Sequence, residues 1–455
     1  MSLKITFLGG VGTVTGSKYL LEGDDARVLV DCGLFQGFKQ LRRRNWAPPP
    51  VDVKRLDAVI LTHAHLDHSG YLPLLIRNGF SGPVFCTGGT RDLCEILLPD
   101  SGHLQEQDAE FANRHGFSRH RPALPLYTKV DAEAALESFS PVPFHEERQV
   151  AGDLSVQFLP GGHILGAAIV KITCGGRTVV FSGDLGRPGT ATMVDPTAVR
   201  EADYLLIEST YGDRLHDRKD PEDALAETIT RTAARGGSLL VPSFAVGRAQ
   251  SLLFHLQNLK AEGRIPPDMP VFLDSPMAIN ASEIFCRHLG EHRLTAEQCR
   301  QTCAVARYTR TADDSKSLDR DPMPKVIISA SGMATGGRVL HHLKVLAPDP
   351  KNTILFAGFQ AGGTRGAAMV GGAERVKIHG AYVPVRAEVA NLSMFSAHAD
   401  SDEIMDWLGN FEDAPHRTFV VHGEPSASDA LRHRIEEELG WACTVPEYGE
   451  EAELT

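Results

Sequence analysis

The sequence predicts an α/β fold in which metal-binding side chains gather at the ends of buried strands. Short apolar runs alternate with helical patterns along most of the 455 residues. Several of these runs end in histidine, aspartate or glutamate, mostly beside glycine. In an α/β fold, ligands bind at the edge formed by the carboxyl ends of the strands. A composition of 42% hydrophobic and 23% charged residues is also that of a packed globular protein.

The first elements are predicted strands. Residues 3–7 alternate apolar and polar side chains, and strands at 18–21 and 27–30 flank a Gly-Asp-Asp turn typical of a hairpin. Asp31 follows directly and puts a carboxylate at a strand end. Two roles carry equal weight for it: forming the turn, or orienting a metal ligand from outside the coordination sphere.

The fold is organised around the loop after the apolar run 56–61. Three imidazoles and one carboxylate stand there within six residues: His63, His65, Asp67 and His68. Neutral imidazole and carboxylate suit a borderline cation such as zinc. His63 and His65 are two residues apart and can converge on one ion, while the other two can turn towards a second.

Later strands end in the same residue types. Predicted strands at 154–159, 177–181, 204–207 and 418–421 precede His163, Asp184, Glu208 and His422 respectively. We therefore expect His63, His65 and His163 on one metal, Asp67, His68 and His422 on another, and Asp184 as the bridging carboxylate. Two metals roughly 3.5–4 Å apart can hold a hydroxide between them and clamp an in-line displacement at phosphorus.

Charge and cysteine usage exclude several classes. A net charge of −12 argues against broad, charge-driven nucleic-acid binding, although it permits a local basic groove. The eight cysteines form no CxxC pair, so we expect reduced thiols in a cytoplasmic protein. No leader and no apolar run of membrane-spanning length is visible, so we expect no membrane association.

The remaining segments read as helices and a second parallel sheet. A helix is expected from about Thr90 to Gly116, broken by Pro99, and another after the Asp220 cap. Strand–helix alternation from about Tyr211 onwards suggests the second sheet. Its glycine-rich loop, with Gly336, Gly337 and Arg338 before a helix, is a candidate phosphate cradle; Arg338 could equally brace the helix.

These motifs resemble the metallo-β-lactamase superfamily, through the His-x-His-x-Asp-His loop with His163 and Asp184. Four further stretches resemble its β-CASP branch of nucleic-acid-processing nucleases. They are Glu208-Ser209-Thr210-Tyr211-Gly212, the run 242–248 with Ser243 and Arg248, Ser331-Gly332-Met333, and the run 395–400 with His398, followed by His422.

The resemblance implies an αββα sandwich with an inserted α/β domain. The expected bounds are 1–210 for the first part of the metallo-β-lactamase domain, 211–392 for the inserted β-CASP domain and 393–455 for the C-terminal part of the metallo-β-lactamase domain. It also implies that His398, paired with Glu208, protonates the leaving oxygen, and that Asp67 belongs to the catalytic set. Histidine at 422 favours RNA over DNA, and Ser243 and Arg248 join the phosphate-contact candidates.

We therefore expect a ribonuclease with two zinc ions per chain. It would hydrolyse single-stranded RNA by attack of a metal-bridging hydroxide, with a histidine as general acid, and act as an endonuclease rather than an exonuclease. RNA is the expected partner, and a homodimer is an allowed state. The alternatives are a small-molecule hydrolase of the same superfamily and a non-catalytic RNA-binding subunit. An insertion of this size argues against the first, because such a lid suits a polymer.

Overall fold

The structure is a computed structural model that describes residues 3–116, 118 and 120–455. Its contacts divide the chain into two compact units, one formed by Met1–Leu215 with His398–Thr455 and the other by His216–Ala397. The second unit is thus inserted into the first along the chain. Both junctions fall five residues later than expected, at 216 against 211 and at 398 against 393. The domain bounds themselves stay a prediction.

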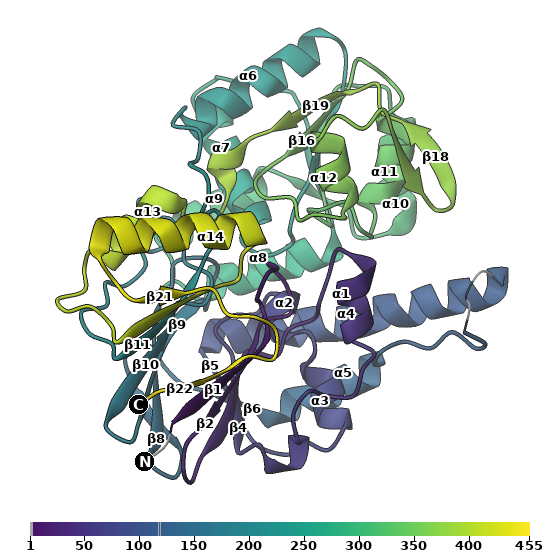
Figure 1. Cartoon of the computed structure of the whole chain (residues 1–455). Helices are drawn as coiled ribbons and strands as arrows, with labels where there is room; N and C mark the ends of the chain where they lie inside the picture. Colours follow the sequence, from purple (N-terminus) through teal and green to yellow (C-terminus); the bar gives the residue numbers. More distant parts are fainter. Residues whose placement is uncertain (1–2, 117, 119) are drawn as a thin grey trace. The chain divides into compact units, whose positions relative to one another are not determined.

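The first unit contains two seven-stranded sheets (Figure 1). One runs in the order β22-β1-β2-β3-β4-β5-β6. The predicted hairpin is its antiparallel β2–β3 pair, and β3 to β6 pair in parallel. The bounds are β1 Lys4–Gly9, β2 Lys18–Glu22, β3 Arg27–Val30, β4 Ala58–Ile60, β5 Val84–Cys86, β6 Phe139–Pro141 and β22 Glu451–Glu453.

The other sheet runs β21-β20-β11-β10-β9-β8-β7. Strands β7 to β10 form an antiparallel meander, whereas β10, β11, β20 and β21 pair in parallel. The bounds are β7 Glu147–Ala151, β8 Leu154–Pro160, β9 Ala168–Cys174, β10 Arg177–Phe181, β11 Tyr204–Glu208, β20 Arg417–Val421 and β21 Cys443–Thr444.

Alternate residues of both sheets share one buried cluster. Phe7, Val30 and Ile60 of the first sheet meet Val170 and Leu206 of the second. The intervening residues of the second sheet, such as Ile169 and Leu205, pack against Trp407 and Leu431 instead. Both faces of these strands are therefore buried, which explains why they read as continuous apolar runs.

Helices flank this sandwich and complete an αββα architecture (Figure 1). Helices α13 and α14 cover the outer face of the second sheet. Beside the first sheet, α3 and α4 pack on α5, and α4 contacts β6. The bounds are α1 Lys39–Arg44, α2 Leu66–Ser69, α3 Leu72–Arg77, α4 Gly88–His115, α5 Lys129–Ala135, α13 Ser401–Leu408 and α14 Pro425–Arg434.

The expectation that Pro99 breaks the helix is wrong, because α4 is continuous from Gly88 to His115. Proline removes one backbone hydrogen bond and kinks a helix, but packing can retain the segment. Here Leu97 and Leu98 are buried just before the proline, and Gly102 lies against the backbone of Thr128 just after it. Tertiary contacts on both sides hold the helix together.

The second unit is built on a parallel six-stranded sheet in the order β14-β13-β15-β12-β16-β19, with a separate β17–β18 hairpin. Its strands are β12 Leu239–Pro242, β13 Val271–Asp274, β14 Arg307–Tyr308, β15 Val326–Ser329, β16 Thr353–Phe356, β17 Arg375–Ile378, β18 Ala381–Pro384 and β19 Glu388–Asn391. The strand–helix alternation of the sequence therefore produces the parallel sheet that it predicted.

Helices pack on both faces of this sheet. The cluster around Leu253 and Ile229 covers one face, and the cluster around Leu343 and Met369 covers the other. Asp220 caps α6 as expected, accepting from the backbone N–H groups of Glu222 and Asp223. The helices are α6 Pro221–Ala234, α7 Arg248–Ala261, α8 Pro276–Arg287, α9 Ala296–Ala304, α10 Ala312–Arg320, α11 Val339–Leu346 and α12 Arg365–Val370.

Across the described part of the chain, we find no helix with the length and apolar character that a bilayer crossing requires.

Candidate metal centre

The loop after β4 carries the densest group of polar side chains in the first unit. The chain turns at Thr62 and enters the single-turn helix α2, with His65 at its N-cap. His63 and His68 are buried, at 0% and 2% exposure. The backbone thus directs histidines into the interior, where uncompensated polar groups are costly.

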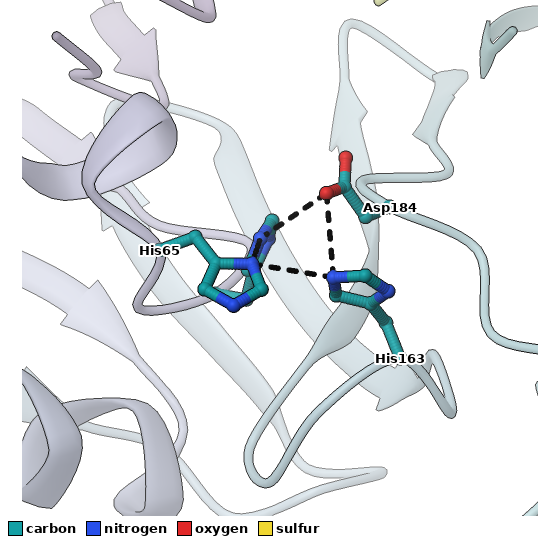
Figure 2. A group of neighbouring side chains, drawn as sticks. His65, His163 and Asp184 are labelled. Atoms are coloured by element: carbon teal, nitrogen blue, oxygen red, sulfur yellow. Dashed lines mark hydrogen bonds and ion pairs between the residues drawn. The ribbon is translucent and has the colours of Figure 1, made fainter. Parts of the chain in front are cut away.

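Four donor atoms converge at the first group (Figure 2). The Nδ1 atom of His65 lies 3.2 Å from Nε2 of His63 and 3.2 Å from Nε2 of His163. The Oδ2 atom of Asp184 lies 3.4 Å from the His63 nitrogen and 3.5 Å from the His163 nitrogen. The structure therefore brings together the four residues that the sequence assigned to one metal.

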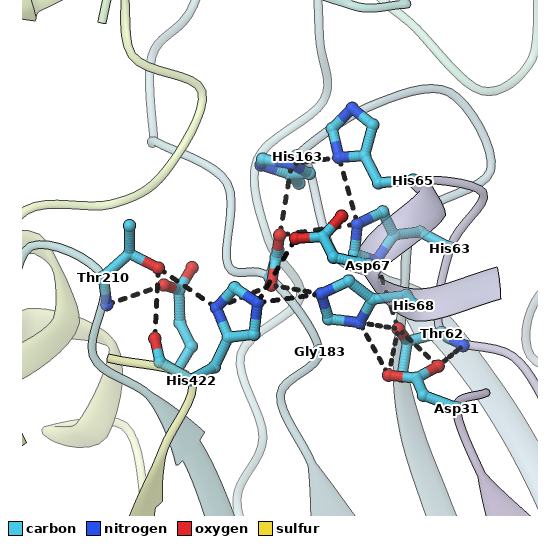
Figure 3. Close-up of polar contacts among 12 residues, drawn as sticks. Asp31, Thr62, His63, His65, Asp67, His68, His163, Gly183, Thr210 and His422 are labelled. Atoms are coloured by element: carbon cyan, nitrogen blue, oxygen red, sulfur yellow. Dashed lines mark hydrogen bonds and ion pairs between the residues drawn. The ribbon is translucent and has the colours of Figure 1, made fainter. Parts of the chain in front are cut away.

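A second group lies around His68 and His422 (Figure 3). It shares Asp184, which contacts His68. The Nε2 atom of His68 lies 3.1 Å from Nε2 of His422 and 3.2 Å from Oδ1 of Asp184. Asp67 places its Oδ2 3.7 Å from the same His422 nitrogen. The two carboxylate oxygens of Asp184 thus face different groups, as a bridging carboxylate requires.

These spacings fit metal coordination. Four ligands about 2.0–2.1 Å from one ion in a tetrahedron lie about 3.3–3.4 Å from one another. The four contacts of the first group span 3.2–3.5 Å. Two imidazole nitrogens at such a distance can be joined by at most one proton, whereas a shared cation satisfies both lone pairs. The residues present therefore suit a metal ion.

The protonation states of the first group also suit a cation. Burial lowers the pKa of His63 to about 3 and that of His65 to about 4. The pKa of His163 is also lowered well below its ordinary value, by burial and by the neighbouring His398. All three rings are neutral at pH 7, which is the form that binds metal.

In the second group, burial alone would raise the pKa of Asp184, but the charges of His422 and His68 hold it well below its ordinary value. Burial would likewise lower the pKa of His68, yet the carboxylates of Asp184 and Asp31 raise it well above its ordinary value. The centre therefore presents a carboxylate that stays ionised among histidines.

Asp31 lies behind His68. Its Oδ2 is 2.7 Å from Nδ1 of His68, and its Oδ1 accepts a 2.8 Å hydrogen bond from the backbone N–H of Thr62. A carboxylate on the outer nitrogen of a ligand histidine fixes the ring and its tautomer. Asp31 takes up a left-handed backbone conformation, with φ of +60°, to reach this position. The contact supports the orienting role over the turn-forming one.

His398 and Glu208 form a pair beside the centre. Nδ1 of His398 lies 3.0 Å from Oε1 of Glu208, and its Nε2 lies 3.9 Å from Oδ2 of Asp184. Glu208 also accepts from the backbone N–H of Leu185, at 2.7 Å. Burial would lower the pKa of His398, but the charges of Glu208 and Asp184 raise it above its ordinary value.

Sequence reasoning gave no role to three residues that support this site. Thr210 places its hydroxyl 3.2 Å from Nδ1 of His422, and Thr62 places its own 3.0 Å from Asp31. Buried Lys18 donates to the carbonyl oxygen of Gly33. Thr62 adjoins His63 in the sequence, and Thr210 lies two residues after Glu208, so their positions were a usable signal. Nothing in the sequence distinguishes Lys18 from a surface lysine.

The candidate phosphate contacts lie in the second unit. Arg338 donates through Nη1 to Asp274 at 2.7 Å and to the carbonyl oxygen of Thr309 at 2.9 Å, and through Nη2 to that of Arg310 at 2.7 Å. These contacts fit the bracing alternative. Ser243 and Arg248 are buried, at 2% and 8% exposure. Gly336 and Gly337 form the turn before α11, where Gly337 has φ of +76°. Phosphate binding by these residues stays a prediction.

Comparison with known families identifies three segments. Residues 11–236 match the metallo-beta-lactamase superfamily, residues 249–369 the Beta-Casp domain, and residues 382–446 the Zn-dependent metallo-hydrolase RNA specificity domain. Metal binding by the histidine and aspartate cluster agrees with these matches.

Individual proteins match over nearly the whole chain. Ribonuclease TTHA0252 of Thermus thermophilus is 38% identical over 437 residues, which cover 94% of this chain and 95% of that protein. Transcription termination factor FttA of Methanocaldococcus jannaschii is 32% identical, over 93% of this chain and 67% of that protein. An RNase J-like protein of the same organism is 30% identical over 98% of both.

A crystal structure of a protein from Enterococcus faecalis superposes with a TM-score of 0.55 over 100% of both chains, at 15% identity, and supports the fold alone. The sequence relatives extend over the sandwich and the inserted unit alike. This chain therefore belongs to the metallo-β-lactamase superfamily, in its β-CASP branch.

Proposed function

We propose that this chain is a metal-dependent ribonuclease that hydrolyses phosphodiester bonds of single-stranded RNA. The observation that carries the proposal is the pair of ligand groups joined at Asp184, with the His398–Glu208 pair beside them. A metal pair of this kind clamps the attacking and leaving oxygens of an in-line displacement at phosphorus. The named relatives, a ribonuclease and an RNase J-like protein, support the reaction class.

We further propose two zinc ions. His63, His65 and His163 would hold one, Asp67, His68 and His422 the other, and Asp184 both. Bound there, zinc would supply an activated water and stabilise negative charge at the phosphoryl group. The chain itself contributes the fixed geometry, because each ligand lies in a loop or short helix that follows a strand of the sandwich.

Proton delivery is assigned to His398. Its Nδ1–H donates to Glu208, which leaves Nε2–H directed towards the centre. The leaving group of phosphodiester cleavage is a sugar alkoxide, which departs poorly unless it is protonated as the bond breaks. The raised pKa of His398 favours the charged ring, which is the form that can donate a proton.

Five finer points belong to the same proposal. The inserted domain spans about residues 211–392, cleavage is endonucleolytic, and a homodimer is an allowed state. Eight cysteines without a disulfide support a reducing compartment such as the cytoplasm. His422 supports RNA over DNA as the substrate, because the RNA-processing members that this chain resembles have a histidine at this position.

One experiment separates the proposed function from its rivals. The purified chain is incubated with end-labelled RNA, with DNA of the same sequence and with a chromogenic lactam, and its metal content is measured before and after chelation. We expect internal cleavage of RNA that chelation abolishes and zinc restores, at two zinc ions per chain. Lactam hydrolysis without RNA cleavage would favour a small-molecule hydrolase. Metal-loaded protein that binds RNA without cutting it would favour a binding subunit.

A further inference from the structure

The segment between Asp31 and Asp52 carries only positive charge. Its twenty residues, 32–51, contain Lys39, Arg42, Arg43 and Arg44 and no acidic residue. The whole chain carries a net charge of −12. Because charges farther away than about 10 Å are largely screened at moderate salt, such a local excess of positive charge matters more to an approaching anion than the net charge does.

The side chains of this segment divide into two sets. Arg44 is packed, with its guanidinium 4.1 Å from the ring centre of Tyr448 and 5.3 Å from that of Phe35. Lys39, Arg42 and Arg43 are exposed, and none forms an ion pair with a described residue. Their charges are therefore available to a ligand.

Two exposed aromatic rings flank the same helix. Phe38 precedes α1 with 50% exposure, and Trp46 follows it with 60%. Large exposed aromatic side chains beside free cations form the combination that single-stranded nucleic acids use. The cations contact phosphates, and the rings stack on bases whatever their sequence. We call these five residues, Phe38, Lys39, Arg42, Arg43 and Trp46, the α1 patch.

The α1 patch is tied to the metal centre. The backbone N–H of Cys32 donates to the carbonyl oxygen of His68 at 2.7 Å, and that of Leu34 donates to Leu66 at 2.8 Å. Lys39 follows Leu34 by five residues, so the two Cα atoms are within about 18 Å of each other. The segment that leads into α1 is therefore the one that supports α2 and its ligands (Figure 1).

Asn45 fixes the far end of this segment. Its side chain accepts from the backbone N–H of Phe35 at 2.9 Å and donates to the Phe35 carbonyl at 2.8 Å. Asn45 is 5% exposed, so the contact is shielded from water. Residues 35–45 form a closed loop that holds the α1 patch in place, although α1 has only six residues and no side-chain cap.

We infer that the α1 patch is a second RNA-binding site, which holds the single strand outside the metal centre. The inference rests on the proposed function for the identity of the polymer. Lys39, Arg42 and Arg43 would contact phosphates, and Trp46 would stack on a base. Since neither contact reads base identity, the α1 patch would raise affinity for longer strands without adding sequence preference.

The test removes the three charges. RNA binding is measured on the metal-loaded His398→Ala protein, which by the proposed function cuts slowly, with and without Lys39→Ala/Arg42→Ala/Arg43→Ala. Each phosphate contact on a single strand contributes about 0.7 to the salt-dependence slope, so we expect the slope to fall by about 2. Trp46→Ala should weaken binding by about five- to hundredfold with the slope unchanged.

A matched control keeps the result specific. Arg114→Ala/Arg121→Ala/Arg148→Ala removes the same three charges from exposed positions elsewhere in the first unit and should leave the slope unchanged. With His398 present, the α1 variant should raise KM at least about tenfold for an RNA of about 30 nucleotides. It should leave an RNA of about 3 nucleotides unaffected, because a single-strand surface takes about 4–16 nucleotides and such a substrate is too short to occupy it.

The outcomes also separate the inference from the proposed function. An unchanged slope in the α1 variant, or an equal fall in the control, overturns the inference. Equal losses on short and long RNA do so as well. If the parent protein cuts no RNA, the proposed function fails, yet the binding slopes still decide the α1 patch.

Discussion

Two buried histidine–carboxylate clusters in this molecule differ in the atoms that their imidazole nitrogens face. In the metal centre, imidazole nitrogens face one another at 3.1–3.2 Å, and burial lowers the pKa of His63 to about 3. In the second unit, His342 has a carboxylate on each nitrogen, with Asp274 and Asp319 both at 2.6 Å. Burial would lower its pKa, but the two carboxylates raise it to about 9.

The difference separates a ligand set from a structural ion pair. His342 is 0% exposed and charged, and Asp274 beside it also accepts from Arg338 and Ser315. Every charge there has a partner within the protein, as a buried ion pair requires. The nitrogens of His63, His65 and His163 in the metal centre face one another instead, and a cation would complete their coordination. His68 there resembles His342, because Asp31 and Asp184 lie on its two nitrogens. The facing nitrogens of the first group, and not burial alone, distinguish the two clusters.

The largest effect is expected at the residue that joins the two ligand groups. Asp184→Ala removes a carboxylate that faces both groups, so both metals should be lost together and RNA cleavage should fall to background. Metal analysis of the purified variant measures this directly. Asp153→Ala, at the exposed β7–β8 turn, serves as control and should keep its full metal content. One tightly held ion in the Asp184 variant would show that Asp184 does not bridge.

The next effect concerns proton delivery by His398. Loss of a general acid costs about 10²–10⁴-fold in rate, so His398→Ala should slow RNA cleavage by that order while its metal content persists. Hydrolysis of bis(p-nitrophenyl) phosphate should lose far less, because its phenolate leaves without protonation. Comparison of the two substrates in one preparation measures the role. Equal losses would assign His398 to substrate positioning instead.

The cluster of His342 with Asp274 and Asp319 should make the stability of the second unit depend on pH. The pKa of His342 is about 9 in the folded state and about 6.5 in the unfolded state, so charged His342 stabilises the folded state fully below about pH 6.5. This contribution, up to about 3 kcal/mol, should be lost as the pH rises through 9. Hydrogen exchange of α11 and β13 amides at pH 6 to pH 10 measures the effect within the second unit. In His342→Gln this dependence should disappear, and its persistence would place the titrating group elsewhere.

The smallest expected effect is at Asp31. Loss of a carboxylate behind a ligand histidine typically weakens metal affinity by about 10–100-fold, and we expect this for Asp31→Asn. Metal titration against a competing chelator gives the change. Asp57→Asn is a suitable comparison, since Asp57 accepts from the backbone of Arg27 and contacts no ligand. An unaltered affinity in the Asp31 variant would reduce its contact with His68 to a packing role.

Much of the fold, and the clustering of the proposed ligands, could be predicted from the sequence because both depend on local patterns. Apolar runs predicted the central strands, and each proposed ligand lies in the loop or short helix after such a run. Strands β17 and β18 were missed because each has only four residues and half or more of them are exposed, which leaves too few apolar positions to mark a strand. Pro99 was misjudged because the contacts of Gly102 with Thr128 are not visible in sequence.

Residues whose role depends on distant partners could not be predicted. Arg338 lies in a glycine-rich stretch that suggests phosphate binding, yet its guanidinium reaches Asp274, 64 positions away in the chain. Lys18 is buried against Phe35 and Tyr71, which only tertiary packing reveals. Local spacing identifies ligands well, but it identifies the residues that support them poorly.

The site can be completed only late in synthesis, because the sheets of the sandwich need the C-terminal segment. Strand β20 lies inside the second sheet beside β11, and β22 pairs with β1, so the last segment closes both sheets. His398 and His422 belong to that segment. A nascent chain that still lacks residues 398–455 has neither the proposed proton donor nor the complete proposed ligand set. A ribosome-bound intermediate therefore carries no complete nuclease site that could cut the messenger that encodes it.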